Sequence, residues 1–223
     1  MSMTTEFYAG PSLEQGGTSI RGKGAAPYVR RLADLLEPGA RILDYGAGKY
    51  ARNADYLRKR GFTVYAYDPF NGRGHKGYEM GAVSRLLPRG KFDVGLTCYV
   101  LNVVPETVER QIVAEVAALS KEQLHVTRSL DIFDSVKGAL ERGDETVCAF
   151  FEEHFMPGRR VGAAFREGRL TDEQILAFCR FGVQTSRGFQ RIPEPEGLHF
   201  VGGGRGHRVF SSSELGPGAR RAS

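Results

Sequence analysis

The residues best suited to chemistry in this sequence are two aspartates that flank a short glycine-rich turn. The turn reads Asp44-Tyr45-Gly46-Ala47-Gly48, and Asp68 follows 20 residues after Gly48. Glycines permit a tight turn and let the backbone approach a ligand closely. In nucleotide-binding units an acid at such a spacing accepts hydrogen bonds from ribose hydroxyls. The pattern therefore predicts a site for a nucleotide-like ligand.

A strand, a helix and a second strand are needed to position these residues. Residues 41–45 are apolar and run directly into the glycines, which predicts a buried strand. Residues 52–60 predict a helix, and the β-branched and aromatic residues of 62–68 predict the next strand. Such a unit forms a parallel strand pair with a right-handed crossover. The alternative is a plain strand–helix turn in which Asp44 caps the helix.

Asp44 also discriminates between kinds of nucleotide. Dinucleotides carry a pyrophosphate, which bare amides at a helix N-terminus bind well and which a neighbouring carboxylate repels. S-adenosylmethionine (SAM) has no phosphate and carries a cationic ammonium and a sulfonium. A carboxylate two residues before Gly46 therefore favours SAM as the cofactor and disfavours NAD(P), which remains an alternative.

The rest of the chain continues to alternate between helix and strand patterns. Further helices are expected after Pro27, near 80–87, after Pro105, at 132–140, around 148–151 and at 171–181, and further strands at 92–98 and 123–127. Residues 183–192 and 198–212 are expected to be two strands joined through 193–197 as a hairpin. The sequence predicts an α/β fold, with a Rossmann-like, doubly wound, mostly parallel sheet closed by an antiparallel C-terminal hairpin.

Composition divides the chain into three parts. Residues 1–25 suggest a flexible N-terminal arm, 26–213 a single domain with an insertion near 144–170, and 214–223 a disordered tail. The proportions of hydrophobic residues (41%) and charged residues (26%) are ordinary for a globular protein. No apolar run reaches the roughly 20 residues that span a bilayer, and the start lacks a secretory pattern. We therefore expect a cytoplasmic protein with no membrane partner.

Cysteine and histidine usage indicates neither disulfides nor a metal centre. Cys98, Cys148 and Cys179 cannot all pair, and none belongs to a CxxC motif. The five histidines are scattered through the chain. We expect reduced core thiols and no bound metal.

Three segments resemble motifs of the class I SAM-dependent methyltransferases. These are 42–48 with the glycine turn, 64–69 with the second strand, and 92–105 with the fourth strand, so the resemblance covers about residues 40–130. More narrowly, 23–27, 43–46 and 99–103 resemble methyltransferases associated with DNA phosphorothioation systems, and phage and mobile-element relatives are also similar.

The class I resemblance implies a set of cofactor contacts. Asp44 would hold the methionine ammonium through water, and Asp68 would bind the ribose hydroxyls. The other implied contacts are Tyr45, Gly46, Ala47, Gly48 and Pro69 along the nucleotide, and Leu96, Thr97 and Cys98 beside the methionine. The family's polar residue near the adenine amino group is not recognisable in 78–90.

Tyr99 and Asn102 are the candidates for contact with the methyl acceptor. Both follow the fourth strand, near the end where such sheets bind ligands. Tyr99 could stack on a planar acceptor and Asn102 could orient one; alternatively Tyr99 packs in the core and Asn102 caps the next helix. The segment lacks the Asn/Asp-Pro-Pro-aromatic motif of amino-methylating DNA enzymes. Cys98 lies in a buried strand, which disfavours it as a cytosine-C5 nucleophile.

Basic segments leave the acceptor open. The net charge is +5, which permits a nucleic acid or nucleotide substrate, and this class is slightly favoured over a small molecule. The basic residues that could meet phosphate are Arg21, Lys23, Arg159, Arg160, Arg166 and the glycine run 202–206, although each could equally be solvated or belong to a hairpin. A catalytically silent SAM-binding module or partner subunit is the rival interpretation, and the oligomeric state is left open.

Overall fold

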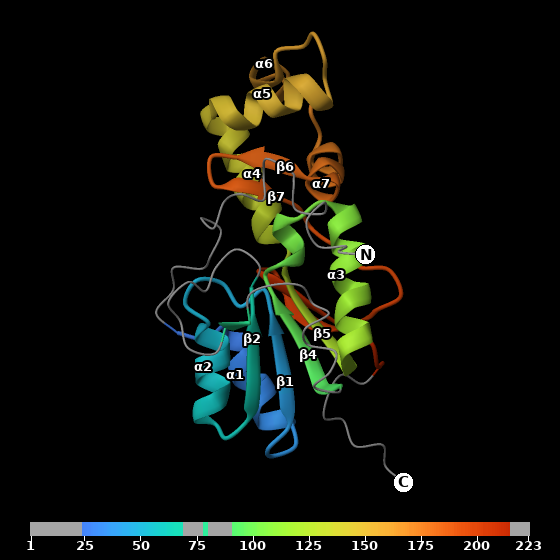
Figure 1. Cartoon of the computed structure of the whole chain (residues 1–223). Coiled ribbons are helices and arrows are strands. Elements are labelled where there is room, and N and C mark those ends of the chain that lie inside the picture. Colours follow the sequence, from blue (N-terminus) through green and yellow to red (C-terminus); the bar gives the residue numbers. More distant parts are fainter. Residues whose placement is uncertain (1–23, 69–77, 80–90, 215–223) are drawn as a thin grey trace.

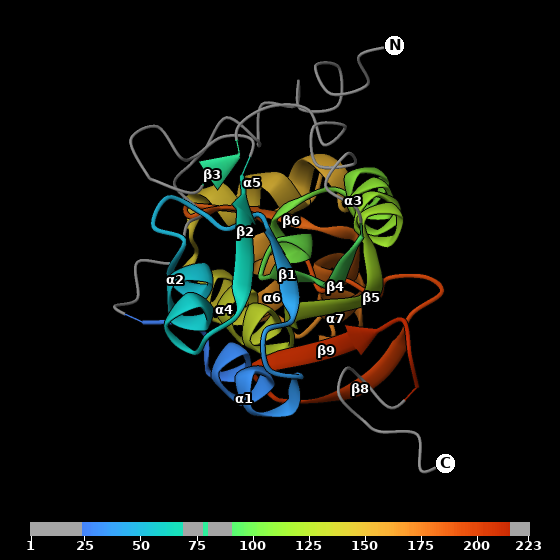
Figure 2. The ribbon, with the colours of Figure 1, turned by 60° about the horizontal axis from the view of Figure 1, so that its bottom comes forward.

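A computed structural model of the chain describes residues 24–68, 78–79 and 91–214. Its centre is a seven-stranded sheet with the strand order β3-β2-β1-β4-β5-β9-β8 (Figures 1 and 2). The strands are β1 (Arg41–Tyr45), β2 (Thr63–Tyr67), β3 (Tyr78–Glu79), β4 (Phe92–Cys98), β5 (Ser120–Arg128), β8 (His199–Gly204) and β9 (His207–Ser211). Strands β1 to β5 are mutually parallel, while β9 is antiparallel to both of its neighbours, β5 and β8. The predicted mostly parallel sheet with a terminal antiparallel hairpin is confirmed.

The helices predicted after Pro27 and Pro105 and at 52–60, 132–140, 148–151 and 171–181 are present, whereas a helix at Val161–Arg166 was not predicted. The helices are α1 (Pro27–Leu35), α2 (Arg52–Lys59), α3 (Glu106–Leu119), α4 (Leu130–Arg142), α5 (Glu145–His154), α6 (Val161–Arg166) and α7 (Asp172–Phe181), with a 3-10 turn, η4, at Leu101–Val103. Pro27 occupies the first turn of α1, where its missing N–H leaves no bond unmade. No helix in the described parts of the chain is long and apolar enough to cross a membrane.

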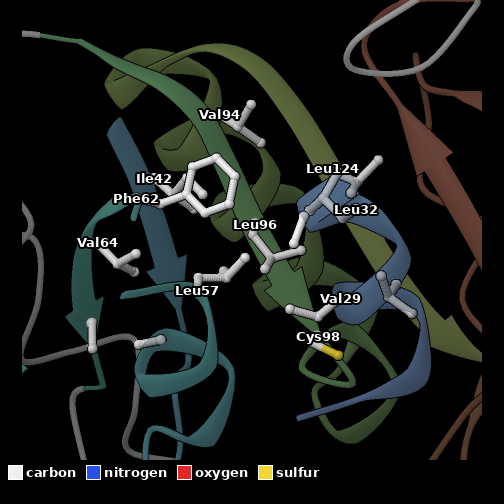
Figure 3. Close-up of a cluster of buried hydrophobic side chains, with 14 of the residues drawn as sticks. Val29, Leu32, Ile42, Leu57, Phe62, Val64, Val94, Leu96, Cys98 and Leu124 are labelled. Carbon is white, nitrogen blue, oxygen red and sulfur yellow. The ribbon is translucent and has the colours of Figure 1, made fainter. Parts of the chain in front are cut away.

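The two faces of the sheet bury separate hydrophobic clusters. Leu32 of α1, Leu57 of α2 and Leu96 of β4 belong to the cluster on one face (Figure 3). On the other face, α3 buries Val108, Ile112, Val116 and Leu119 against the strands. Full burial of such a side chain contributes about 1.5–3 kcal/mol, so these helices fix the sheet from both sides.

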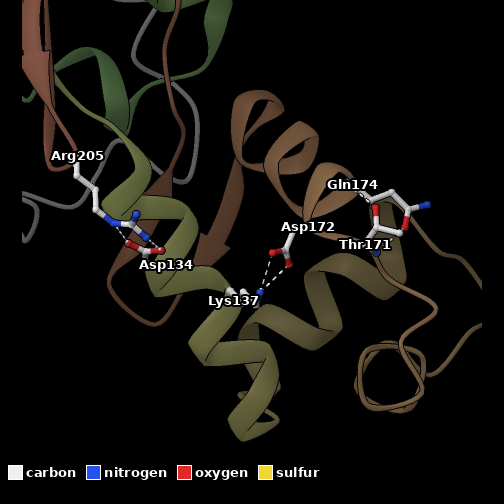
Figure 4. A network of polar contacts seen from close by, with 6 residues as sticks. All are labelled: Asp134, Lys137, Thr171, Asp172, Gln174 and Arg205. Atoms are coloured by element: carbon white, nitrogen blue, oxygen red, sulfur yellow. Dashed lines mark hydrogen bonds and ion pairs between the residues drawn. The ribbon is translucent and has the colours of Figure 1, made fainter.

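A third cluster lies beyond the carboxyl end of β5. It joins α4, α5, α6 and α7 to a small sheet of β6 (Val183–Thr185) and β7 (Gly188–Gln190). These elements, residues 130–192, form the upper part of Figure 1, and we call them the cap. The predicted capping signature of α7 is present, since Thr171 and Gln174 exchange side-chain and backbone hydrogen bonds (Figure 4). The ion pair Lys137–Asp172, at 2.7 Å, also joins α4 to α7.

The predicted pairing of 183–192 with 198–212 is wrong. Each segment instead folds on itself: Val183 pairs with Gln190 in the cap, and Gly204 pairs with His207 at the end of the main sheet. Both hairpins close through two-residue turns, which lose little chain entropy compared with a longer connection. The linker between them contains Pro193 and Pro195, which have no backbone N–H to donate to a ladder.

Several predictions fall outside the described residues. These are the N-terminal arm with Arg21 and Lys23, the cofactor contact Pro69, the helix near 80–87 and the tail beyond Glu214.

Candidate cofactor and acceptor site

The glycine turn lies at the carboxyl end of β1 and is held by β2. The backbone N–H groups of Gly46 and Ala47 both donate to the carbonyl oxygen of Tyr67, at 2.7 and 3.0 Å. Gly46 has a φ of +77°, and a Cβ there would lie 2.4 Å from Val100 Cγ2. Only glycine fits this position, because any side chain would collide with the segment that follows β4.

Asp68 closes the turn from the neighbouring strand. Its Oδ2 accepts a hydrogen bond of 2.8 Å from the backbone N–H of Gly48, and the residue is buried. The acid that the spacing singled out therefore does lie against the glycine turn.

Asp44 precedes the turn and is only 1% exposed. It accepts a hydrogen bond from the backbone N–H of Ala54, and its Oδ2 has no hydrogen-bond partner within the described part of the chain. Burial raises the pKa of Asp44 to about 7, against the lowering effect of the Ala54 N–H, and the Asp68 charge raises it further. A buried, unsatisfied carboxylate oxygen is unfavourable unless a donor reaches it.

The capping interpretation of Asp44 holds in part. Ala54 lies in the first turn of α2, where a carboxylate is favourable. The N-cap residue itself is Ala51, which has a left-handed φ of +40° and a methyl side chain that cannot form a capping hydrogen bond. One oxygen of Asp44 thus supports α2, and the other has no hydrogen-bond partner among the described residues.

Thr97 and Cys98 end β4 with their side chains on opposite faces of the sheet. Thr97 is fully buried, and its Oγ1 lies 2.9 Å from Nδ1 of His125, whose Nε2 lies 3.0 Å from Gln123 Oε1. Burial lowers the pKa of His125 to about 3, so the imidazole is neutral. On the other face, burial raises the pKa of the Cys98 thiol, which suits a core residue and not a nucleophile.

A pocket of about 390 Å³ opens at the carboxyl ends of β4 and β5. The residues that line it are Tyr99, Asn102, Val103, Arg128, Asp131, Arg187, Gln190 and Gly206. Sequence reasoning found Tyr99 and Asn102, and the fold brings these two together. The pocket lies between the main sheet, the cap and the turn of the β8–β9 hairpin.

Tyr99 and Asn102 have unusual environments. Tyr99 has a left-handed φ of +61°, rare for an aromatic residue, and burial raises the pKa of its hydroxyl to about 12. Asn102 is 1% exposed, and its Oδ1 has no hydrogen-bond partner in residues 24–68, 78–79 and 91–214. It does not cap α3, which begins after Pro105 without a side-chain cap.

Sequence reasoning missed the polar residues of the cap side of the pocket. Arg128 donates to Asp131 at 2.6 Å and to Gln190 at 3.1 Å, so β5, α4 and β7 meet at its guanidinium. Arg128 is the last residue of β5, the strand next to β4. Its place at the carboxyl end of a parallel strand could have identified it as a pocket residue from the sequence. Arg187 and Gln190 could not be placed, because their hairpin had been paired with the wrong segment.

The basic residues proposed to meet phosphate lie elsewhere. Arg159, Arg160 and Arg166 are exposed near α6 in the cap, and none of them lines the pocket. The run 202–204 is the end of β8, and Arg205 in the following turn pairs with Asp134 at 2.7 Å (Figure 4). Of this glycine run, Gly206 reaches the pocket.

The part of the chain that contains the glycine turn matches a known protein family. A model of the methyltransferase domain family matches residues 19–141, which is more than half of the chain. A comparison with curated protein sequences gives no match. The narrower likeness to phosphorothioation-associated and phage methyltransferases finds no support in these comparisons.

Solved structures share the fold at low sequence identity. A Rhodobacter sphaeroides protein assigned to the zinc-dependent alcohol dehydrogenases has 14% identity and a TM-score of 0.50, with 85% of this chain and 90% of that chain covered. Magnesium protoporphyrin IX methyltransferase from Synechocystis PCC 6803, with bound S-adenosylhomocysteine (SAH), has 16% identity, a TM-score of 0.43 and coverage of 82% and 80%.

A TehB-like SAM-dependent methyltransferase from Corynebacterium glutamicum has 19% identity and a TM-score of 0.38, with 45% of this chain and 61% of that chain covered. This chain therefore spans less than two thirds of that structure. The matched residues include the glycine turn, Asp68 and the end of β4. The chain belongs to the methyltransferase domain family, as a class I member with a Rossmann-like fold and SAM as its cofactor.

Proposed function

We propose that this chain transfers the methyl group of SAM to an acceptor bound in the pocket beside Tyr99. The observation that carries this proposal is that Oδ2 of the buried Asp44 has no hydrogen-bond partner among the residues that the structure describes. Asp44 precedes a glycine turn that lies within the family's matched segment. A cationic ammonium, or a water molecule bound to it, would supply the missing donor. The same orphaned oxygen is poorly suited to a pyrophosphate.

The other cofactor contacts follow from the geometry of the turn. Asp68 would accept from the ribose hydroxyls while keeping its bond to Gly48. Backbone groups of Tyr45, Gly46, Ala47 and Gly48 would lie along the cofactor, and the end of β4 at Thr97 and Cys98 would lie beside the methionine. The side chains of Thr97 and Cys98 are buried in the two cores, so any contact from them would be made by backbone atoms.

The turn and the pocket are neighbours. Val100, which a side chain at Gly46 would strike, directly follows Tyr99 of the pocket. When bound, SAM supplies an electrophilic methyl group on a sulfonium. The protein's contribution would be to hold the acceptor in line with that group, and proximity and orientation of this kind supply much of the rate in such reactions.

The pocket favours a small acceptor. Its volume of about 390 Å³ suits a small molecule or a single nucleotide. The arginines that supported a nucleic acid substrate lie outside it. We therefore place a small polar molecule, with nucleotides included, ahead of a nucleic acid strand.

A SAM-binding module without turnover is the second candidate. It is favoured by the lack of an uncommitted base among the described residues of the pocket, since Asp131 is engaged by Arg128 and by the backbone N–H of Ser129. Transfer of a labelled methyl group from SAM to any acceptor would exclude it. SAM binding without transfer, across acceptors from every class tried, would support it.

A crystal structure of the SAH complex tests the proposal. We expect the amino group of SAH within hydrogen-bond reach of Asp44, directly or through one water molecule. We expect its ribose at Asp68 and its sulfur facing the pocket of Tyr99 and Asn102. SAH bound with its sulfur turned away from that pocket would contradict the proposed reaction.

A further inference from the structure

We propose that the acceptor is a small molecule that carries both an anionic group and an N–H or O–H donor, recognised by Arg187 and Asn102 respectively. This inference rests on the proposed function, because it names the class of substrate that the pocket takes. It uses two features of the pocket that the binding of SAM does not explain.

The first feature is an uncompensated positive charge. Among the residues that line the pocket, Arg128 and Arg187 are cationic and Asp131 is anionic, which leaves a net charge of +1 (two minus one). The guanidinium of Arg128 is already committed to Asp131 and Gln190. Arg187 is exposed at the β6–β7 turn, and its guanidinium has no ion pair or hydrogen bond within residues 24–68, 78–79 and 91–214. A carboxylate or phosphate in the pocket would find its counter-charge there.

The second feature is the buried amide of Asn102. Its Oδ1 is inaccessible to bulk solvent and accepts no hydrogen bond from the described residues. Burying an acceptor without a partner is unfavourable, so such a group in a pocket indicates a donor on the ligand. A molecule with an amino, amide or hydroxyl group would satisfy it.

Asn102 is also held rigidly in place. Its backbone carbonyl oxygen accepts a hydrogen bond of 2.8 Å from the backbone N–H of Arg191. The side chain of Arg191 forms a buried ion pair with Glu109 of α3. The amide therefore lies where the sheet, α3 and the cap meet, and a site fixed by several elements orients a ligand well.

The two recognition groups come from different parts of the fold. Asn102 belongs to η4, directly after β4, whereas Arg187 belongs to the cap. A ligand that contacts both must bridge the sheet and the cap. It therefore needs its donor and its anionic group at separate ends.

Matched ligands test this inference. We would titrate 4-aminobenzoate, benzoate (which lacks the donor) and aniline (which lacks the anion), together with adenosine 5′-monophosphate and adenosine. Calorimetry would be run on the full chain with and without saturating SAH. The variants are Arg187→Gln and, as a control, Arg159→Gln, which removes an exposed arginine of the cap that does not line the pocket.

We expect each anionic ligand to bind at least tenfold more tightly than its neutral counterpart, and 4-aminobenzoate to bind more tightly than benzoate. Arg187→Gln should abolish the preference for the anion, and Arg159→Gln should leave it intact. The inference is overturned if neutral ligands bind as well as anionic ones, if no ligand binds, or if both variants behave alike. Failure of SAH itself to bind would instead contradict the proposed function, and the titrations without SAH keep the two results separate.

Discussion

At the scale of single residues, Asp44 differs clearly from an ordinary, solvent-exposed aspartate. It is buried just before the glycine turn; one oxygen accepts a hydrogen bond from Ala54, and the other has no partner in the described parts of the molecule. The sequence predicted its position before the glycine turn, and its role toward SAM stays a prediction, argued from the suitability of a carboxylate for a cation. The burial itself could not be predicted, since it depends on α2 and β4 packing over the strand end.

Asp44 should make the folded protein less stable as the pH rises. Its pKa is raised from 3.8 to about 7 in the folded state, so the native protein binds more protons than the unfolded chain between these values. The resulting decrease in the free energy of unfolding is absent below about pH 4 and complete above about pH 7. It amounts to at most about 4 kcal/mol. The free energy of unfolding of Asp44→Asn minus that of the wild type should therefore increase across this window. Urea denaturation at several pH values measures it, and a difference independent of pH would show that Asp44 titrates normally.

Gly46 is a position of the glycine turn at which a side chain should not be tolerated. Alanine there combines a left-handed backbone with a Cβ 2.4 Å from Val100. Gly39→Ala is a matched control, because Gly39 has the same φ of +77° with open space around its Cβ. We expect Gly39→Ala to lose about 1–2 kcal/mol of stability and to bind SAH normally. Gly46→Ala should lose more and bind SAH at least tenfold more weakly. If the two variants lost equal stability and bound SAH with equal affinity, the side chain of Val100 would have to move aside without cost, which would contradict the steric argument.

At the level of elements, α3 and the cap are joined by a buried ion pair. Glu109 is 2% exposed and Arg191 is 5% exposed, and burial raises the pKa of Glu109 in spite of the arginine charge. This contact could not be predicted from the sequence. Glu109 falls on a helix face that also carries apolar residues, and Arg191 belongs to the segment whose strand pairing was mispredicted.

Removing one partner of this pair should lower the free energy of unfolding far more than removing both. Glu109→Leu leaves the guanidinium of Arg191 buried without its counter-charge and should lose about 3–5 kcal/mol of unfolding free energy. Adding Arg191→Met should restore much of that loss. The exposed pair Glu106–Arg110 on the same helix is the control, and breaking it should change stability by less than about 1 kcal/mol. Denaturant titration of the single and double variants measures each value, and additive losses in the buried pair would contradict the coupling.

On the scale of the whole molecule, local patterns predicted the sheet and its helices, because each βα unit is short and its periodicity is clear. The longer-range arrangement was less accessible. The pocket combines the ends of β4 and β5 with the cap and with the β8–β9 turn, so residues up to about 100 positions apart share it. That is why Tyr99 and Asn102 could be found from their place after a strand, whereas Arg187 and Gln190 could not.

Calorimetric titration of SAH into the full chain tests the central claim most directly. The wild type should bind SAH at one site, and Asp68→Ala should bind it at least tenfold more weakly. Asp172→Ala, which removes an exposed aspartate of the cap that pairs with Lys137, should bind it like the wild type. No binding by the folded wild-type protein, or undiminished binding by Asp68→Ala, would contradict the account.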